Sequence, residues 1–199
     1  MLRELRPALV LLALLTVITG LAYPFAITGI AQLVFPSQAN GSVVERNGQP
    51  VGSSLIGQNF TKPEYFHSRP SATTDTDPKD PTKTVPAPYN AMNSSGSNLG
   101  PTSQALSDRV KADIATLQAE NPGKPIPADM VTTSGSGLDP DISPEAAAFQ
   151  APRVARERKV SEARVMEIVQ ANTKGRFLGL LGEPRVNVLA LNLALDSIN

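Results

Sequence analysis

The sequence predicts an α+β protein in which one N-terminal transmembrane helix is followed by a single extracytoplasmic α+β domain. Three observations lead to this prediction. Residues 7–35 contain no charged residue and no histidine. Beyond them, apolar residues follow helical spacing in some stretches and strand alternation in others. The roughly 160 residues after the apolar run suit one soluble domain.

The apolar run over residues 7–35 is the predicted anchor. A helix rises about 1.5 Å per residue, so roughly 20 residues cross the hydrocarbon core. Lipid offers no partners to the backbone, which requires a helix here. Gly20 and Pro24 lie inside the run among other small residues, a pattern that favours close packing against another membrane helix. The alternative is a secretory signal peptide cut near residues 29–31, but the apolar part of such peptides spans only about 7–15 residues.

The charges that flank the anchor predict its orientation. Arg3 and Arg6 precede it, and basic residues stay on the cytoplasmic side. We therefore expect residues 1–6 in the cytoplasm, a membrane helix over 7–35, and a soluble domain over 36–199 outside. Removing Arg3, Arg6 and Glu4 from the 18 basic and 18 acidic residues leaves 16 and 17 in the domain, which gives no electrostatic reason to bind nucleic acid. Cysteine is absent, so disulfides and thiolate chemistry are excluded.

The first element after the anchor is a predicted hairpin over residues 41–57. Asn47-Gly48 is the preferred two-residue type I′ turn, and Pro50 on the returning strand indicates a sheet edge. The next stretch, residues 59–70, gathers ring side chains and holds His67, the only histidine. His67 is either a hydrogen-bonded structural residue or a ligand or pH-sensitive contact. The structural role is favoured, because no second histidine is present to complete a metal site.

Residues 71–101 are rich in Ser, Thr, Asp, Asn, Pro and Gly, which predicts a long polar loop. Its clustered aspartates suggest a calcium loop that begins at Asp75. The EF-hand pattern requires Gly and Glu at positions that hold Asp80 and Pro86 here, so no metal site is expected.

Three helices are predicted in the second half of the chain. Apolar residues at helical spacing predict a helix over 103–120, capped by Ser103 and ended by Asn121-Pro122. Residues 139–173 predict two helices capped by Ser143 and Ser161, the first interrupted by Pro152. The buried stripe of the second comprises Val165, Ile168 and Val169.

Residues 186–189 are a predicted strand, followed by a strand or short helix that recurring leucines place in the core.

Two further patterns leave a choice between a binding site and ordinary structure. The Gly-rich connector over residues 132–137 is either a phosphate cradle or a plain loop, and no Gly-Lys-Ser/Thr follows it. A cluster of basic residues is either a solvated helix end or a binding surface for an acidic partner. It comprises Arg153, Arg156, Arg158 and Lys159. No nucleophile–base set, P-loop or Gly-x-Ser-x-Gly turn is present. No catalytic residue is therefore assigned, and an anchored hydrolase is disfavoured against an accessory subunit.

Several strings in one order nevertheless resemble a known family across essentially the whole chain. They are Arg6–Leu9, Gln38–Ser42, Leu55–Gln58, Tyr65–Ala72, Ser97–Gly100, Gly137–Pro144, Gln150, Arg153–Ala155, Val186–Leu189 and Leu191–Asp196. The chain closely resembles the KdpC family, the C subunit of the bacterial high-affinity potassium-transporting Kdp ATPase. The stretch least like the family is the Asp-rich one from Thr73 to Thr84, and no role is assigned there.

The resemblance implies a non-catalytic subunit of an ATP-driven potassium uptake complex in the bacterial inner membrane. Its implied partners are a channel-like potassium subunit, a P-type ATPase subunit and a small membrane peptide. No cofactor is bound tightly; potassium is the transported ion, and ATP enters through the complex. The family is described as required for assembly and as a catalytic chaperone that raises the ATP affinity of the ATPase subunit. That role implies nucleotide contacts at Gln150, Ser136 and Gly137.

The orientation argument conflicts with that role, because a domain outside the cell cannot meet cytoplasmic ATP. The alternative is a structural cap over the outer mouth of the potassium-carrying subunit, with no nucleotide contact. Loop carbonyls and Asp139 or Asp141 are then candidates to line the ion's entrance. Expected partner contacts are Gly20, Pro24, His67, Arg69, Asp139 and Arg153.

Overall fold

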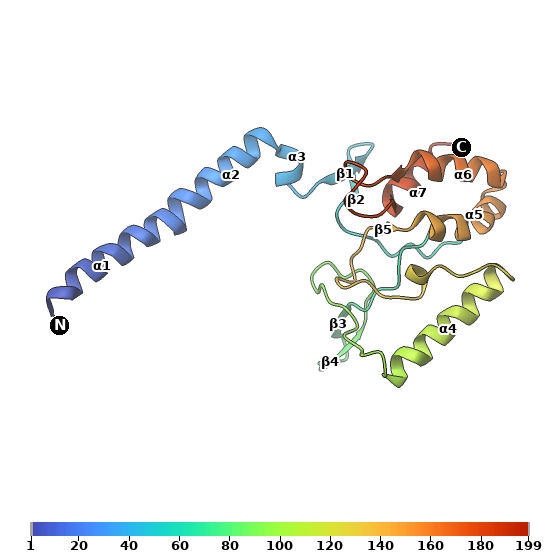
Figure 1. The fold of residues 1–199 in the computed structure, drawn as a ribbon, viewed down its shortest axis with the longest axis horizontal. Helices are drawn as coiled ribbons and strands as arrows, with labels where there is room; N and C mark the ends of the chain where they lie inside the picture. The colour runs from blue at the N-terminus through green and yellow to red at the C-terminus, as the bar shows by residue number, and fades with distance from the viewer. Residues whose placement is uncertain (1, 199) are drawn as a thin grey trace. The chain divides into compact units, whose positions relative to one another are not determined.

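The computed structural model describes residues 2–198, and the chain forms two compact units, residues 1–53 and residues 54–199 (Figure 1). The first unit contains the apolar helix and a hairpin. The second contains the remaining helices and sheets. Together they give the α+β content that the sequence predicts, with one N-terminal apolar helix.

A long helix fills most of the first unit. It consists of α1 (Leu2–Val17), the π-helical turn η1 (Ile18–Ala22) and α2 (Tyr23–Val34). The most apolar 18-residue stretch within Arg3–Val34 has a mean hydropathy of 2.2, and among the described residues this is the one helix long and apolar enough to cross a membrane. The helix is therefore the candidate membrane span that the sequence predicts.

The π turn has a local cause in Pro24. Proline has no N–H to donate to the carbonyl four residues back, here that of Gly20, and its ring crowds that carbonyl. In η1 the backbone widens, and the N–H of Tyr23 bonds to the carbonyl of Ile18, five residues back. Gly20 and Pro24 thus lie together at a specific irregularity of the helix, with their surfaces exposed.

The rest of the first unit is short. Helix α3 (Pro36–Ala39) leads to the antiparallel hairpin of β1 (Val43–Arg46) and β2 (Gln49–Ser53). Asn47 and Gly48 have φ angles of 54° and 74°, as a type I′ turn requires. The hairpin prediction is confirmed.

The core of the second unit lies among three helices and a small sheet. The helices are α5 (Pro144–Arg158), α6 (Glu162–Ala171) and α7 (Val188–Asp196), which Figure 1 shows grouped together. The sheet has the order β5 (Asp141–Ile142), β7 (Arg185–Asn187), β6 (Thr173–Lys174), with both pairs antiparallel. The buried cluster includes Ala147, Val154, Val165, Val186, Leu191 and Leu195.

The predicted caps of α5 and α6 are confirmed. Ser143 and Ser161 each accept a hydrogen bond from the backbone N–H three residues on. The prediction that Pro152 interrupts the first of these helices is wrong, because α5 continues through it to Arg158. Eight residues of α5 are buried, and this packing outweighs the one hydrogen bond that the proline removes.

The C-terminal prediction is wrong in part. The strand ends at Asn187 rather than at residue 189, and α7 starts at Val188. Asn187 causes the switch, because its side chain accepts a hydrogen bond from the N–H of Ala190 and caps the new helix. Leu189, Leu191 and Leu195 are buried, so the leucines do mark a core element.

A hairpin, a helix and a 3₁₀ turn complete this unit. The stretch predicted as a loop over residues 71–101 contains an antiparallel hairpin of β3 (Thr74–Asp77) and β4 (Asp80–Pro86), whose alternating threonines favour strands. Helix α4 (Gln104–Glu120) starts at the predicted cap Ser103. Its predicted apolar face is only half-buried, and no residue of α4 is fully buried. The 3₁₀ turn η2 (Ala128–Met130) lies between α4 and β5.

Candidate functional site

The residues from Pro63 to Ser71, here called the strap, connect most of the residues that the sequence singled out. The strap has no helix or strand of its own, yet Phe66 within it is fully buried. Buried backbone groups need hydrogen-bond partners wherever regular structure does not supply them. In the strap these partners are side chains of α5 and α7.

Two buried side-chain amides bind successive peptide units of the strap. Asn192 of α7 accepts from the N–H of Phe66 at 2.9 Å and donates to its carbonyl at 3.0 Å. Gln150 of α5 accepts from the N–H of His67 at 2.8 Å and donates to its carbonyl at 3.1 Å. Each amide thus replaces the two hydrogen bonds that a neighbouring strand would make. We call Gln150 and Asn192 the amide clamps.

Arg153 supports the strap from the next turn of α5. Its guanidinium donates to the carbonyls of Pro63 and Tyr65, to Oε1 of Gln150 at 2.8 Å, and to Glu120 of α4 at 2.8 Å. The side chain of Arg153 is only 7% exposed. A buried charge is costly unless it is paired and fully hydrogen-bonded, and both conditions are met here.

Arg158 also supports the strap, from a position further along α5. It donates to the carbonyl of Glu64 at 2.7 Å and to Asp196 of α7 at 2.8 Å, and lies 5.0 Å from the ring centroid of Tyr65. The predicted basic patch is therefore divided. Arg153 and Arg158 turn inward, whereas Arg156 and Lys159 are exposed.

His67 has the hydrogen-bonded structural role that the sequence favours. Its Nε2 lies 3.0 Å from the carbonyl of Lys62, and a carbonyl only accepts, so Nε2 carries the proton of the neutral ring. Burial lowers the pKa of His67 below 6.5, and the charge of Arg153 lowers it further. The backbone hydrogen bond and Glu120 act in the opposite direction and are outweighed. His67 is thus held neutral near pH 7.

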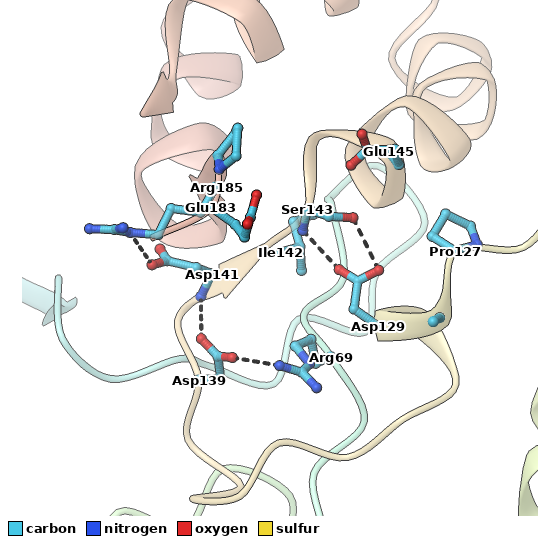
Figure 2. Close-up of a pocket in the computed structure, with 12 residues that line it drawn as sticks. Arg69, Pro127, Asp129, Asp139, Asp141, Ile142, Ser143, Glu145, Glu183 and Arg185 are labelled. Atoms are coloured by element: carbon cyan, nitrogen blue, oxygen red, sulfur yellow. Dashed lines mark hydrogen bonds and ion pairs between the residues drawn. The ribbon is translucent and has the colours of Figure 1, made fainter. Parts of the chain in front are cut away.

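The strap continues to Arg69, which lies at the edge of an acidic pocket of about 580 Å³ (Figure 2). Arg69 Nη1 lies 2.9 Å from Oδ2 of Asp139, and Arg185 Nε lies 3.0 Å from Oδ2 of Asp141. The pocket is lined by five carboxylates: Asp129, Asp139, Asp141, Glu145 and Glu183.

The aspartates of this pocket are already engaged within the domain. Oδ1 of Asp139 accepts from the N–H of Asp141 at 3.1 Å, and Asp129 accepts from both the N–H and the hydroxyl of Ser143. These bonds tie β5, η2 and the start of α5 to the strap. Within residues 2–198, no group of three or more His, Asp or Glu residues is arranged to hold a metal ion.

A second pocket, of about 550 Å³, is lined by residues of the strap and of α4. His67, Arg69, Tyr89 and Arg109 contribute to its lining. The Tyr89 hydroxyl donates to the Arg69 carbonyl at 2.7 Å, and burial raises the pKa of Tyr89 to about 12. Arg109 pairs with Asp113 at 2.9 Å. Neither pocket is lined by the residues that the resemblance connects with nucleotide.

Those residues lie in two separate places. Gln150 is 1% exposed and bonded as described above. Ser136 and Gly137 lie in a loop before β5, where Ser94 Oγ donates to the Ser136 carbonyl and Ser71 Oγ donates to the Gly137 carbonyl. None of the hydrogen bonds that Gln150 makes with described residues involves this loop. The Gly-rich connector is a loop packed against other loops, and no helix begins directly after it.

The structure also brings forward residues that the sequence did not single out. Asn192 binds Phe66, and Glu120 neutralises Arg153. Asn192 did carry a signal: it is a polar residue between Leu191 and Leu193 in an apolar run, and polar residues in such positions need a partner. Glu120 at the end of a solvated helix carried no such signal.

Comparison with known proteins places these features in a family. The family model described as KdpC, K+-transporting ATPase, c chain, matches residues 5–197. A potassium-transporting ATPase KdpC subunit of Methylorubrum extorquens is 68% identical over 195 residues, which cover 98% of this chain and 97% of that protein. The subunit of the same name from Rhodopseudomonas palustris is 68% identical over 197 residues, 99% of this chain and 98% of that protein. That of Bradyrhizobium diazoefficiens is 66% identical over 196 residues, 98% of each chain.

Proposed function

The chain belongs to the KdpC family of K+-transporting ATPase c chains, and we propose that its folded domain is a structural cap on the outer side of the complex. In this proposal residues 1–6 are cytoplasmic, the apolar helix crosses the bacterial inner membrane, and the domain lies over the mouth of the potassium-carrying subunit. The subunit holds the assembly together and is not catalytic by itself. Its partners are the channel-like subunit, the P-type ATPase subunit and a small membrane peptide.

The observation that carries the proposal is the environment of Gln150. Its side-chain oxygen already accepts from His67 and from Arg153, and its nitrogen donates to the His67 carbonyl. A nucleotide contact would require these bonds to break inside the core, leaving the N–H and carbonyl of His67 without partners and removing one acceptor from Arg153. Each such group costs about 1–3 kcal/mol. Gln150 therefore acts on the domain's own strap.

The anchor supports the same orientation. Arg3 and Arg6 precede the apolar helix, and the next basic residue after it is Arg46. Basic residues close to a membrane helix are retained in the cytoplasm. The domain that follows is then extracytoplasmic, on the side from which potassium arrives.

The proposed partner contacts follow from exposure. Gly20 and Pro24 lie on the surface of the membrane helix, where small residues permit close helix packing. Arg69 and Asp139 are half-buried at the edge of the acidic pocket. His67 and Arg153 contribute indirectly, because they hold the strap that carries Arg69. Potassium is the transported ion and is not held by a site in this chain.

The competing role is the catalytic chaperone that raises the ATP affinity of the ATPase subunit. It requires the domain on the cytoplasmic side and a nucleotide near Gln150, Ser136 or Gly137. Of these three, only Ser136 is exposed, and its hydroxyl accepts from the N–H of Leu138 at 3.1 Å.

Cysteine labelling separates the two roles, because the natural chain has no cysteine. Met92 is 97% exposed, so Met92→Cys leaves the packing unchanged. In intact cells that make the whole complex, a membrane-impermeant maleimide is expected to label Met92→Cys without permeabilisation. Glu4→Cys, before the anchor, is the matched control and is expected to react only after permeabilisation. The reverse pattern would overturn the cap.

A second measurement addresses nucleotide directly. Purified complex is irradiated with a photoreactive ATP analogue, and the labelled subunits are identified. Label is expected on the ATPase subunit and not on this chain. Cross-linked peptides that contain residues 132–150 of this chain would contradict the proposal and support the chaperone role.

A further inference from the structure

An apolar loop joins β6 to β7 in the second unit. Its four large side chains are strongly exposed: Phe177 is 68% exposed, Leu178 79%, Leu180 79% and Leu181 64%. No other stretch of residues 54–198 exposes so many large apolar side chains together. Exposed apolar clusters of this kind mark contact with a protein or a membrane.

The loop has a defined shape. Phe177 and Leu181 form an isolated antiparallel bridge, and Arg176 pairs with Glu183 at 2.8 Å across the base. Leu178 and Gly179 turn the chain at φ angles of 53° and 74°. The apolar side chains therefore lie on a closed tip rather than on a frayed segment.

The tip also supplies partners for most of its own backbone. The N–H groups of Phe177, Gly179, Leu180 and Leu181 all donate to carbonyls of the loop itself, at 2.8–3.1 Å. A segment that enters hydrocarbon must satisfy its backbone internally, because lipid offers no replacement for water. A loop that contacts another protein through a hydrated interface does not need internal pairing, because water can bond to its backbone groups.

The charges around the loop also favour contact with a membrane. Lys174, Arg176 and Arg185 lie at its base, where Arg176 pairs with Glu183 and Arg185 pairs with Asp141. Three basic residues thus face two acids, which leaves one net positive charge beside the exposed apolar tip. Basic residues beside apolar ones are typical of segments that lie at a membrane interface, where they meet anionic headgroups. The chain's own apolar helix tethers the domain to a bilayer, because only residues 35–53, which contain α3 and the β1–β2 hairpin, separate α2 from the second unit.

We propose that residues 177–181 insert into the headgroup region of the membrane that holds the chain's own anchor, as a second point of attachment for the domain. The attachment would limit rotation of the domain about its single helix. It depends on the exposed tip and its basic base and not on the side of the membrane that the domain occupies.

The test uses the assembled complex, reconstituted into vesicles of phosphatidylcholine and phosphatidylglycerol. A single cysteine at Leu180→Cys carries an environment-sensitive fluorophore, with Met92→Cys as the water-exposed control. Both native side chains are mostly exposed, so neither substitution removes core packing. At position 180 we expect blue-shifted emission that nitroxide-labelled lipid quenches, and at position 92 neither effect. Adding Leu178→Ser and Leu181→Ser is expected to abolish the quenching at position 180.

Two outcomes would overturn the proposal. Emission at position 180 that matches position 92 would show that the loop stays in water. Blue-shifted emission that nitroxide lipid leaves unquenched would show that the loop is covered by another subunit. Repeating the measurement in vesicles of phosphatidylcholine alone separates apolar insertion from attraction to anionic lipid. Without anionic headgroups the basic residues are no longer attracted, so weaker quenching is expected.

Discussion

The side chain of Gln150 binds both backbone groups of His67. The His67 N–H donates to Oε1 of Gln150 at 2.8 Å, and the His67 carbonyl accepts from Nε2 of Gln150 at 3.1 Å. The two residues are 83 positions apart in the chain. One side chain thereby fixes the register of the strap against α5. Asn192 does the same for the adjacent Phe66 from α7. The strap is consequently held like a strand between two helices.

Gln150→Ala is expected to destabilise the domain by about 3 kcal/mol. The substitution leaves the half-buried N–H and carbonyl of His67 unpaired and removes an acceptor from Arg153, and each orphaned group costs about 1–3 kcal/mol. Urea unfolding of the detergent-solubilised chain measures the effect. Gln170→Ala, at an exposed position of α6, is the control and is expected to change stability by at most about 0.5 kcal/mol. A similar small effect at both positions would contradict the clamp.

Arg153→Ala is expected to be among the most damaging single changes, at about 3–5 kcal/mol, because it leaves Glu120 and two strap carbonyls without their buried partner. Arg164→Ala removes an ion pair with Glu167 in which the side chains are 53% and 64% exposed. Surface pairs contribute little, so this control is expected to cost under about 1 kcal/mol. Urea unfolding compares the two variants. An equal loss of unfolding free energy in both would show that Arg153 does not support the strap.

The pH dependence of stability should carry a contribution from His67. Its pKa in the folded state is lowered below 6.5, first by burial and then by Arg153, so the unfolded state binds a proton more readily. Stability from this residue is therefore complete above about pH 6.5 and falls as the pH drops below that value. His67→Gln, which keeps a donor toward Lys62, is expected to flatten the decline between about pH 7 and pH 5.5.

Thermal unfolding of the two forms across this range measures the difference. Carboxylates titrate at lower pH, so their effect is expected to remain in both. An unchanged slope in His67→Gln would mean that the histidine does not contribute.

The sequence predicted local elements well wherever one residue type has one physical role. Ser103 and Ser143 cap helices because a hydroxyl accepts from a free N–H of the first turn. Asn47-Gly48 forms its turn because both residues adopt positive φ. These signals depend on neighbours in the chain and need no tertiary information.

The strap was beyond such reasoning, because its partners are distant. Ring side chains gather around His67 in the sequence, but nothing local indicates that amides more than 80 residues away replace a neighbouring strand. Arg153 shows the same limit: four basic residues in one stretch predict a surface patch, whereas Glu120 and the strap carbonyls draw one of them into the core. The π turn before Pro24 is intermediate between the caps and the strap. Its cause, the proline, is visible in the sequence, but the position of Pro24 in the apolar run does not by itself predict a π turn.

The last prediction concerns two neighbouring glycines of the loop before β5. Gly137 has a φ of 68°, and a Cβ there would lie 2.5 Å from Cγ2 of Thr73 and 2.6 Å from the Ser95 carbonyl oxygen. Gly135 has open space, because no atom beyond the glycine itself and its two chain neighbours lies within 4 Å of the place that a Cβ would occupy. Gly137→Ala is therefore expected to cost about 3 kcal/mol through left-handed strain and overpacking, and Gly135→Ala to change stability little.

Thermal unfolding of the two variants in the full chain tests this pair. A marked loss in Gly137→Ala alone indicates that the loop's glycine serves the packing of residues 71–73 and 95, because only this position meets neighbouring atoms. If both variants instead kept their stability but weakened ATP-dependent transport by the complex, the loop would have a functional surface that packing does not explain. Normal transport in Gly135→Ala, together with destabilised Gly137→Ala, is the result that the contacts around Gly137 lead us to expect.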